Sequence, residues 1–293
     1  MSTKHPVIAV TGSSGAGTSM VLESFAHIFR RERISPHMLE GDAFHRYDRV
    51  AMRERIQQGD NGKQSPISHF SPEANLLEEL EVLFRQYGEI GNGKTRRYIH
   101  SDEDPEYHVE NQPTGSFTPW KEIPEASDLL FYEGLHGAHC DDRVDIAKHV
   151  DLCIGVAPII NLEWIQKLHR DQDHRGYSQD EVVDTILRRM PDYVNYICPQ
   201  FSRTHVNFQR VPTVDTSNPF IAADIPSPDE SMVVIRFADP KGIDFPYLLS
   251  MLDGSWMSRP NNIVVPGGKM GLAMQLIFTP MILRLMDQKK RAL

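Results

Sequence analysis

The sequence has no excess of basic residues, because its 31 Lys and Arg are outnumbered by 40 Asp and Glu and the net charge is −9. Nucleic-acid-binding domains carry a basic surface, so a nucleic-acid partner is not expected. An anionic substrate would have to be held by a local basic cluster against the field of the whole molecule. The positions of the arginines, lysines and histidines are therefore informative.

Cysteine and long apolar runs are also scarce. The three cysteines, Cys140, Cys153 and Cys198, are widely spaced and form no C-x-x-C pair, which argues against a disulfide framework and for a reducing compartment. No unbroken apolar run reaches the length of a membrane span, and the short stretch Val7–Val10 leads into glycines rather than into a signal-peptide cleavage site. We expect a cytoplasmic protein with no membrane partner.

A lysine is missing from an otherwise recognisable phosphate-binding loop. Residues 12–19 read G-S-S-G-A-G-T-S, whereas the usual loop is G-x-x-x-x-G-K-[ST] between a strand and a helix. Glycines let the backbone aim N–H groups at phosphate oxygens, and a helix N-terminus behind them favours an anion. A tight turn without a ligand is the alternative interpretation. The predicted nucleotide-binding residues are Gly12, Ser13, Ser14, Gly15, Ala16, Gly17, Thr18, Ser19 and Met20.

Strand-like and helical segments alternate along the chain, which predicts an α/β fold with a mostly parallel, mixed sheet covered by helices on both faces. Helices are expected from Ser71 to Gly88, after Asn161, from Ser178 with Glu181 as its capping partner, and over about 270–290. The expected strands are Val7–Val10, His37–Glu40, Leu129–Tyr132, Leu152–Val156, Val211–Val214, Met232–Phe237 and Ile263–Val265.

We interpret residues 1–293 as a single domain built around the phosphate-binding loop. A polar, proline-rich excursion is expected over about 101–127, and a lid region over about 161–181. Ligands of such sheets bind beyond the carboxyl ends of the strands, so the residues that follow each strand are the candidates for chemistry.

Two acids follow expected strands. Asp42 could take a proton from an attacking hydroxyl, or it could simply cap the helix that follows. His45 and Arg49 would then share one face of that helix and could hold a phosphate. Glu133 ends the apolar strand that begins at Leu129, a position from which a carboxylate helps to hold Mg²⁺.

A charged segment, K-L-H-R-D-Q-D-H-R-G-Y-S, covers residues 167–178. Lys167, Arg170 and Asp171 share one helix face, and Gly176 follows Arg175 at the helix end. One interpretation is a solvated surface helix. The other is a lid whose cations replace the missing loop lysine, since a charge pair at 4 Å is worth about 1 kcal/mol in water but about 4 kcal/mol at an effective dielectric of 20.

The loop G-S-S-G-A-G-T-S, the segment E-G-D-A-F-H-R at 40–46 and the motif K-L-H-R-D-x-x-x-R-G-Y-S together closely resemble phosphoribulokinases, the bacterial class in particular. The resemblance extends over essentially the whole chain, including H-F-S-P-E-A-N at 69–75 and V-D-T-S-N-P-F at 214–220. Thr18 is typical of that class. The family usually has Glu where this chain has Asp180, and a shorter acid still suits the first turn of a helix.

The resemblance implies MgATP-dependent phosphorylation of ribulose 5-phosphate to ribulose 1,5-bisphosphate in the Calvin cycle. It also implies activation by NADH, restraint by AMP and assembly into homo-octamers, for which Arg31, Arg188, Arg189, Arg236 and Arg259 are candidate effector or interface residues. The implied roles are a general base at Asp42, charge stabilisation by Lys167 and Arg170 with help from Asp171, Mg²⁺ binding by Ser19 and Glu133, and sugar-phosphate binding by His45, Arg49, Tyr98, His100 and Arg175.

Two alternatives stay open at this point. The R-D-x-x-x-R-G lid is shared by other small-molecule kinases of the same architecture, such as uridine and pantothenate kinases. The missing lysine is also compatible with a non-catalytic nucleotide sensor.

Overall fold

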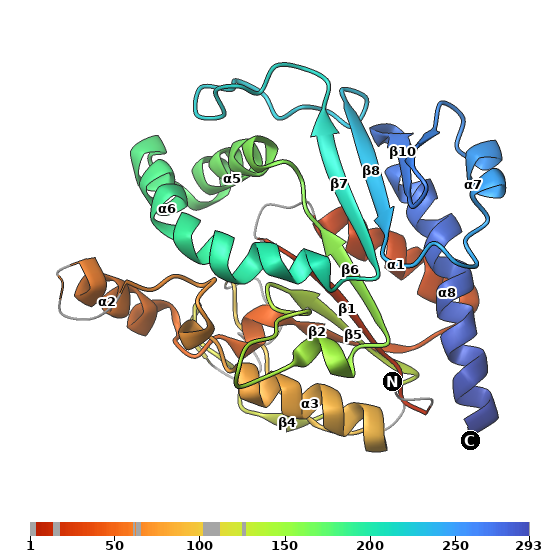
Figure 1. Cartoon of the computed structure of the whole chain (residues 1–293). Helices are drawn as coiled ribbons and strands as arrows, with labels where there is room; N and C mark the ends of the chain where they lie inside the picture. Colours follow the sequence, from red (N-terminus) through yellow and green to blue (C-terminus); the bar gives the residue numbers. More distant parts are fainter. Residues whose placement is uncertain are drawn as a thin grey trace.

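A mixed sheet of eight strands runs through the molecule in the order β2-β5-β1-β6-β7-β8-β10-β9 (Figure 1). The computed structural model describes residues 4–13, 18–60, 62, 66–101, 112–124 and 127–292. The strands of this sheet are β1 Val7–Gly12, β2 Pro36–Glu40, β5 Leu129–Gly134, β6 Leu152–Val156, β7 Val206–Pro212, β8 Ser231–Phe237, β9 Trp256–Arg259 and β10 Asn262–Pro266.

The first five strands in that order are parallel, with β1 at their centre, and β8, β10 and β9 continue the sheet antiparallel. Parallel strands buried on both faces require continuous apolar runs, and Val7–Val10 and Leu129–Tyr132 are buried throughout. The predicted mostly parallel, mixed sheet is confirmed. Because β2, β5, β1 and β6 point the same way, their carboxyl ends meet at one edge.

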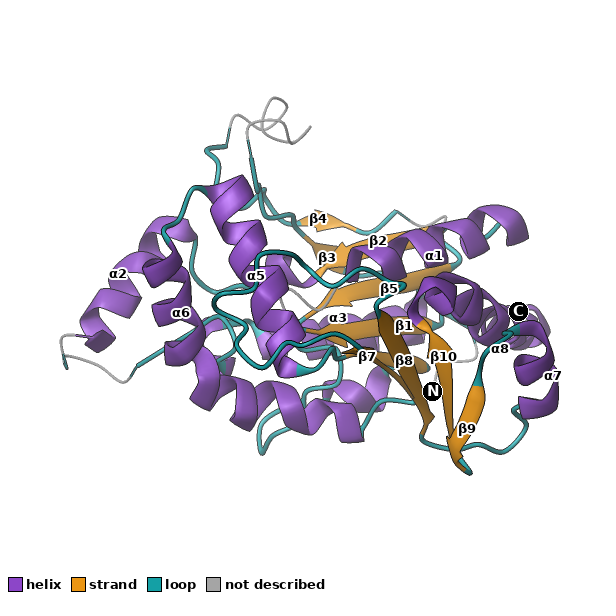
Figure 2. Ribbon diagram, turned by 90° about the horizontal axis from the view of Figure 1, so that it is seen from above, coloured by secondary structure: helices purple, strands orange, loops and turns teal. Residues whose placement is uncertain are grey.

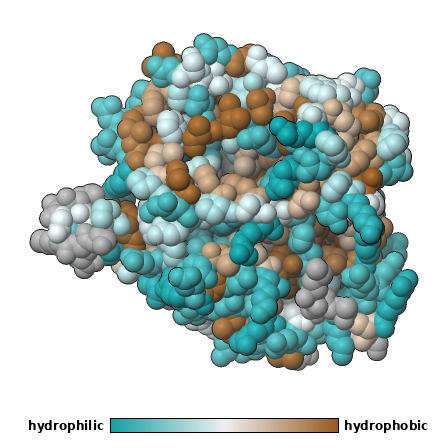
Figure 3. Space-filling model, in the orientation of Figure 1, coloured by the Kyte–Doolittle hydropathy of each residue, from teal (hydrophilic) through white to brown (hydrophobic). Residues whose placement is uncertain are grey.

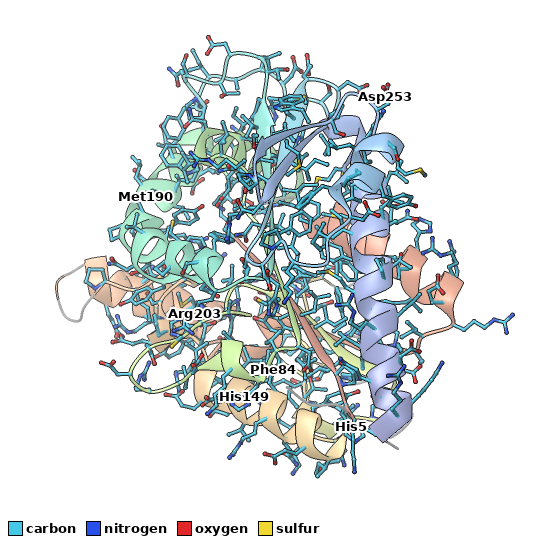
Figure 4. The ribbon with its side chains drawn as sticks, turned by 45° about the vertical axis from the view of Figure 1, so that its right-hand side comes forward. His5, Phe84, His149, Met190, Arg203 and Asp253 are labelled. Atoms are coloured by element: carbon cyan, nitrogen blue, oxygen red, sulfur yellow. The ribbon has the colours of Figure 1, made fainter. Side chains whose placement is uncertain are left out.

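Helices cover both faces of the sheet, as expected (Figure 2). One core joins the sheet to α1 and α8, and a second core on the other face joins it to α3 and the short turns η1 and η3. Phe84 of α3 and His149 of η3 lie side by side on that face (Figure 4). The helices are α1 Thr18–Glu32, α2 Arg49–Asp60, α3 Leu77–Ile90, α5 Ile160–Arg175, α6 Gln179–Asp192, α7 Phe245–Met251 and α8 Met270–Ala292.

Short 3₁₀ and π turns connect these elements. They are η1 Gly41–Phe44, η2 Pro72–Ala74, η3 Ile146–His149, η4 Tyr193–Ile197, η5 Cys198–Ser202 and η6 Gly267–Lys269. A small hairpin of β3 Lys94–Thr95 and β4 Lys121–Glu122 brackets the polar excursion expected over 101–127. Residues 102–111 and 125–126 of that excursion lie outside the described residues.

Three local expectations were wrong. The helix expected from Ser71 to Gly88 is split, because η2 ends after one turn and α3 then runs to Ile90 and closes on Gly91 in the left-handed conformation. His45 and Arg49 do not share a helix, since η1 ends at Phe44 and α2 begins at Arg49. Only Val211 and Pro212 of the strand expected at Val211–Val214 are extended in a sheet, as the end of β7, which begins at Val206.

The segment Gly267–Ala292 is long and apolar enough to cross a membrane by length and composition alone, which the sequence analysis did not anticipate. Its buried side chains, among them Met274, Phe278 and Ile282, pack into the core shared with α1 and the sheet. That packing is typical of a core helix. Together with the lysines and arginine in its last turn, it identifies α8 as part of the globular fold.

Candidate active site

The predicted nucleotide loop lies where β1 ends and α1 begins. Gly12 is the last residue of β1 and pairs with Val156 of β6, Ser13 is buried, and α1 opens at Thr18. Met20 is half-buried against the core. Ser14, Gly15, Ala16 and Gly17 lie outside the described residues, and of Thr18 and Ser19 the structure describes only the helical backbone. The strand–loop–helix order that a phosphate loop needs is therefore present.

Two glycines bring neighbouring strand ends close together. A Cβ on Gly41, just after β2, would lie 2.8 Å from the Cα of Gly134, and a Cβ on Gly134 would lie 2.7 Å from the Cα of Gly41. Only residues without a side chain permit this approach. Each glycine belongs to a Glu-Gly pair, so the contact places the ends of β2 and β5, which carry Glu40 and Glu133, next to each other.

Asp42 lies in η1 and is not a helix cap, because Glu40 occupies that position. Its Oδ1 is 3.1 Å from Nε2 of His45, and its Oδ2 is 3.8 Å from Nε2 of His100. Burial alone would raise the pKa of the Asp42 carboxyl. The hydrogen bond and charge of His45, together with the charges of His100 and His69, outweigh burial and hold this pKa well below its usual range. Asp42 is therefore a carboxylate at neutral pH and can accept a proton.

The other predicted sugar-phosphate residues gather around Asp42 from separate elements. The ring of Tyr98 lies 5.0 Å from that of His100 and 6.4 Å from that of His45. Arg49 donates from Nη2 to the His100 carbonyl at 3.1 Å. His45 and His100 thus contact the Asp42 carboxylate, and Tyr98 and Arg49 contact these two histidines. The Arg175 side chain lies outside the described residues.

Glu133 lies beside the nucleotide loop, because β5 pairs with β1 and sets Glu133 opposite Val10. Within the ranges that the structure describes, no three His, Cys, Asp or Glu side chains are grouped to hold a metal ion. One carboxylate next to a phosphate loop nevertheless fits Mg²⁺, which binds through one or two carboxylates and takes its other ligands from phosphates and water.

Helix α5 carries the predicted lid cations. Lys167 and Asp171 form a buried ion pair, and Arg170 lies 3.1 Å from the other oxygen of Asp171. Burial, and then the nearby charge of Arg189, lower the pKa of Lys167 to about 8, although Asp171 opposes the shift. The helix ends at Gly176 in the left-handed conformation, and α6 begins with the predicted capping box of Ser178 and Glu181.

Sequence reasoning missed the residues that connect these parts. Glu163 of α5 accepts hydrogen bonds from Ser13 of the nucleotide loop and from Tyr193 of η4. His69 lies between Asp42 and His45 on one side and Lys167 and Arg189 on the other, because the charges of all four affect its pKa. The charge of Arg189 lowers the pKa of both His69 and Lys167, and its role at an effector site or interface stays a prediction. The segment H-F-S-P-E-A-N pointed to His69, but no pattern pointed to Glu163.

The surface over these elements is uneven. On the face seen in Figure 3, a hollow separates a mostly hydrophilic lower half from an upper half where apolar side chains gather. Helices α5 and α6 lie in the upper half, and the segment from β2 to α2 lies in the lower half (Figure 1). A carboxylate base, donors for an anionic acceptor, a phosphate loop and buried cations together form a site suited to phosphoryl transfer.

Comparison with known proteins agrees with this geometry. Residues 7–217 match the model of the Phosphoribulokinase / Uridine kinase family. The chain is 62% identical over 289 residues to a phosphoribulokinase of Nitrobacter vulgaris, covering 99% of both chains, and 62% identical over 292 residues to the chromosomal phosphoribulokinase of Cupriavidus necator, covering 100% and 99%. A solved phosphoribulokinase from Rhodobacter spheroides superposes with a TM-score of 0.90 at 55% identity, over 99% and 100% of the two chains.

Proposed function

The chain belongs to the phosphoribulokinase/uridine kinase family, and from that membership we propose that it is a phosphoribulokinase. It transfers the γ-phosphoryl group of MgATP to ribulose 5-phosphate, giving ribulose 1,5-bisphosphate and ADP in the Calvin cycle. The similarity to phosphoribulokinases over the whole length of both chains supports the activity. The single observation that carries the acceptor's identity is the group of His45 and His100 at Asp42, with Arg49 and Tyr98 next to them, which suits a sugar that already bears a phosphate.

In this proposal Asp42 takes the proton of the acceptor hydroxyl, and the oxygen of that hydroxyl bonds to the γ-phosphorus. The bond from the γ-phosphorus to the bridging oxygen of ATP breaks at the same time, and ADP leaves. Lys167 and Arg170 stabilise the charge on the transferring group, and Asp171 holds both cations in position. Glu133 and Ser19 would hold Mg²⁺, which would neutralise charge on the nucleotide phosphates when bound. Arg175 joins His45 and Arg49 on the acceptor phosphate.

The rival acceptors within the family separate in one assay. ADP release is measured by a coupled assay with ribulose 5-phosphate, uridine or pantothenate at equal concentrations. We expect turnover with ribulose 5-phosphate and little with the two unphosphorylated acceptors, because neither carries the phosphate that the basic side chains near Asp42 would bind. Faster release with uridine or pantothenate would assign the chain to another branch of the family. No release with any acceptor would favour a nucleotide sensor.

Regulation and assembly form a second part of the proposal. The resemblance to the bacterial class supports activation by NADH, a homo-octameric assembly and a cytoplasmic location. The same assay, run with and without NADH, tests activation through the rate at limiting ribulose 5-phosphate. Light scattering on the purified protein gives the mass of the assembly.

A further inference from the structure

Asn75 lies directly opposite His45 in a backbone bridge. The two residues form an isolated antiparallel pair, in which Leu76 N donates to the Phe44 carbonyl at 2.7 Å and Arg46 N donates to the Ala74 carbonyl at 2.8 Å. Asn75 is buried, with 2% of its surface exposed. The bridge therefore fixes the Asn75 amide against the His45 ring.

The direction of the Asn75 amide follows from its neighbours. Its Nδ2 lies 3.0 Å from the His69 carbonyl and 2.8 Å from the Ser71 carbonyl, and both of those oxygens only accept hydrogen bonds. The nitrogen must face them, because an oxygen in its place would meet two acceptors. Asn75 Oδ1 then faces Nδ1 of His45 at 2.8 Å. Since that oxygen only accepts, Nδ1 of His45 must carry a hydrogen.

The opposite ring nitrogen meets Asp42. His45 Nε2 lies 3.1 Å from Asp42 Oδ1. A neutral ring with its hydrogen on Nδ1 has only a lone pair at Nε2, and a lone pair cannot bond to a carboxylate oxygen. A hydrogen bond between the two atoms therefore needs a second ring proton on Nε2, because Asp42 is a carboxylate and carries none.

We propose that Asn75 is a positioning residue that keeps a hydrogen on Nδ1 of His45, so that His45 Nε2 and Asp42 Oδ1 hold one shared proton between them. This inference rests on the proposed function, because it assigns how the base of that reaction is prepared. The shared proton occupies Oδ1 and leaves Oδ2 of Asp42 to accept the proton of the acceptor hydroxyl. Asn75 itself contacts neither substrate nor the reacting atoms.

The described titratable groups next to the pair are neutral or bound elsewhere. His136, whose Nε2 lies 3.1 Å from Asn75 Nδ2, has its pKa lowered to about 3 by burial, so it is neutral. His69, whose ring lies 4.7 Å from that of His45, has its pKa lowered first by burial and then by the charge of His45, so it is neutral. His100 lies between Asp42 Oδ2 and Glu40, 3.8 Å and 3.6 Å from their oxygens. Arg96 donates to the His45 carbonyl, not to its ring. The charges of Lys167 and Arg189 also lower the pKa of His69.

Two variants separate the shared proton from simple packing. Asn75→Ala and Asn75→Asp both remove the amide N–H groups that bind the His69 and Ser71 carbonyls. Only Asn75→Asp keeps an acceptor oxygen facing Nδ1 of His45. Structural damage is at least as large in Asn75→Asp, whose second carboxylate oxygen faces the same two carbonyl oxygens, whereas only Asn75→Ala removes the acceptor from Nδ1 of His45. Asn207→Ala, which removes a buried amide that donates to the Phe201 carbonyl, is the matched control.

Ring-¹⁵N NMR of the free full-length protein gives the first readout, with His45→Gln used to assign the signal. We expect Nδ1 of His45 to be protonated in the wild type and in Asn75→Asp at pH 8, and the proton to move to Nε2 in Asn75→Ala. A bare Nδ1 in the wild type would overturn the proposal without any substitution. So would an Asn75→Ala spectrum identical to that of the wild type.

Kinetics give the second readout. We expect Asn75→Ala to lose about tenfold in kcat/KM for ribulose 5-phosphate, as for coupled members of one hydrogen-bond network, and Asn75→Asp to lose less. In a His45→Gln background the two variants should be equal, and Asn207→Ala should match the wild type throughout. Equal losses from Asn75→Ala and Asn75→Asp with His45 present would overturn the proposal. Absence of turnover with every acceptor would defeat the proposed function and leave the NMR test intact.

Discussion

The role of Asp42 depends on its environment at the scale of single atoms. Its side chain keeps 41% of its surface exposed, so an acceptor can reach it, while the neighbouring histidines keep it ionised. An acid at this position that served only to cap a helix would need neither feature. The structure has Glu40 at the cap position, which removes that alternative.

We expect Asp42→Asn to lower kcat by about 10²–10⁴-fold while MgATP still binds, because an amide cannot take the hydroxyl proton. Steady-state kinetics and a nucleotide titration measure the two quantities. Asp141→Asn is the matched control, since Asp141 also pairs with a histidine, His139, at 3.3 Å but lies outside the site. Turnover of Asp42→Asn at the wild-type rate would contradict the assignment of the base.

Glu163 is a buried carboxyl whose charged form destabilises the folded state. Burial raises its pKa to about 7, although hydrogen bonds from Ser13 and Tyr193 and the charges of Lys167 and Arg170 pull it the other way. A carboxyl whose pKa is raised on folding binds more protons in the folded state between about 4.5 and 7. Stability therefore falls as the pH rises through that window.

We expect Glu163→Gln to remove this pH dependence. Relative to the variant, the wild type should lose about 3 kcal/mol in its free energy of unfolding between pH 5 and pH 8, which corresponds to the pKa shift. Urea unfolding of both proteins at the two pH values measures the difference. Unfolding free energies that change in parallel with pH would show that Glu163 keeps its ordinary pKa.

At the scale of elements, the turn that ends α5 lies next to the residues that we propose as lid cations. Gly176 has a φ of 68°, its N–H donates to the Gln172 carbonyl, and Tyr177 N donates to the Asp171 carbonyl. This turn fixes the backbone of Asp171, the residue that holds Lys167 and Arg170. The left-handed conformation suits glycine, because a Cβ there costs about 1–2 kcal/mol.

We expect Gly176→Ala to lower kcat severalfold, since the strained turn shifts the end of the helix that carries the cations. Gly242→Ala is the matched control, because Gly242 also has a positive φ and open space around its Cα but lies between β8 and α7. Both variants should lose similar stability, measured by thermal unfolding. Equal kcat values for the two variants would show that the turn does not control the lid.

Local patterns predicted the elements whose ends carry their own signals. The capping box of Ser178 and Glu181 and the glycine after Arg175 gave both ends of the α5–α6 turn. Prediction failed where tertiary contacts decide. Asn75 pairs with His45 rather than continuing a helix from Ser71, and η1 stops at Phe44 because His45 is extended in that pair.

At the scale of the molecule, the strand order brings the site together. With β1 between β5 and β6, the nucleotide loop, Glu133 and the start of α5 come to one edge of the sheet, and β2 adds Asp42. The rule that ligands bind beyond strand carboxyl ends was enough to find these residues from sequence. It could not find Glu163, His69 or Asn75, because their roles depend on contacts between segments up to 150 residues apart in the chain.

We expect MgATP to stabilise the whole fold despite Thr18 in the position of the loop lysine. A ligand at 100 times its Kd that binds only the folded state adds about 2.7 kcal/mol. Thermal unfolding with increasing MgATP should show a midpoint that rises with concentration, with MgGTP at equal concentrations as the comparison. An unfolding midpoint that stays constant as the MgATP concentration rises would mean that the loop at residues 12–19 does not bind the nucleotide.

We propose that cations of α5 take over the task of the absent loop lysine. The single-turnover rate of phosphoryl transfer at saturating MgATP and ribulose 5-phosphate is the measurement that tests this role. Removing one preorganised charge at a transition state costs on the order of 10²–10³-fold. We predict a loss of that size for Lys167→Met, a smaller loss for Lys167→Arg, and an MgATP affinity close to that of the wild type for both. A wild-type rate in Lys167→Met would show that Lys167 does not replace the loop lysine in phosphoryl transfer.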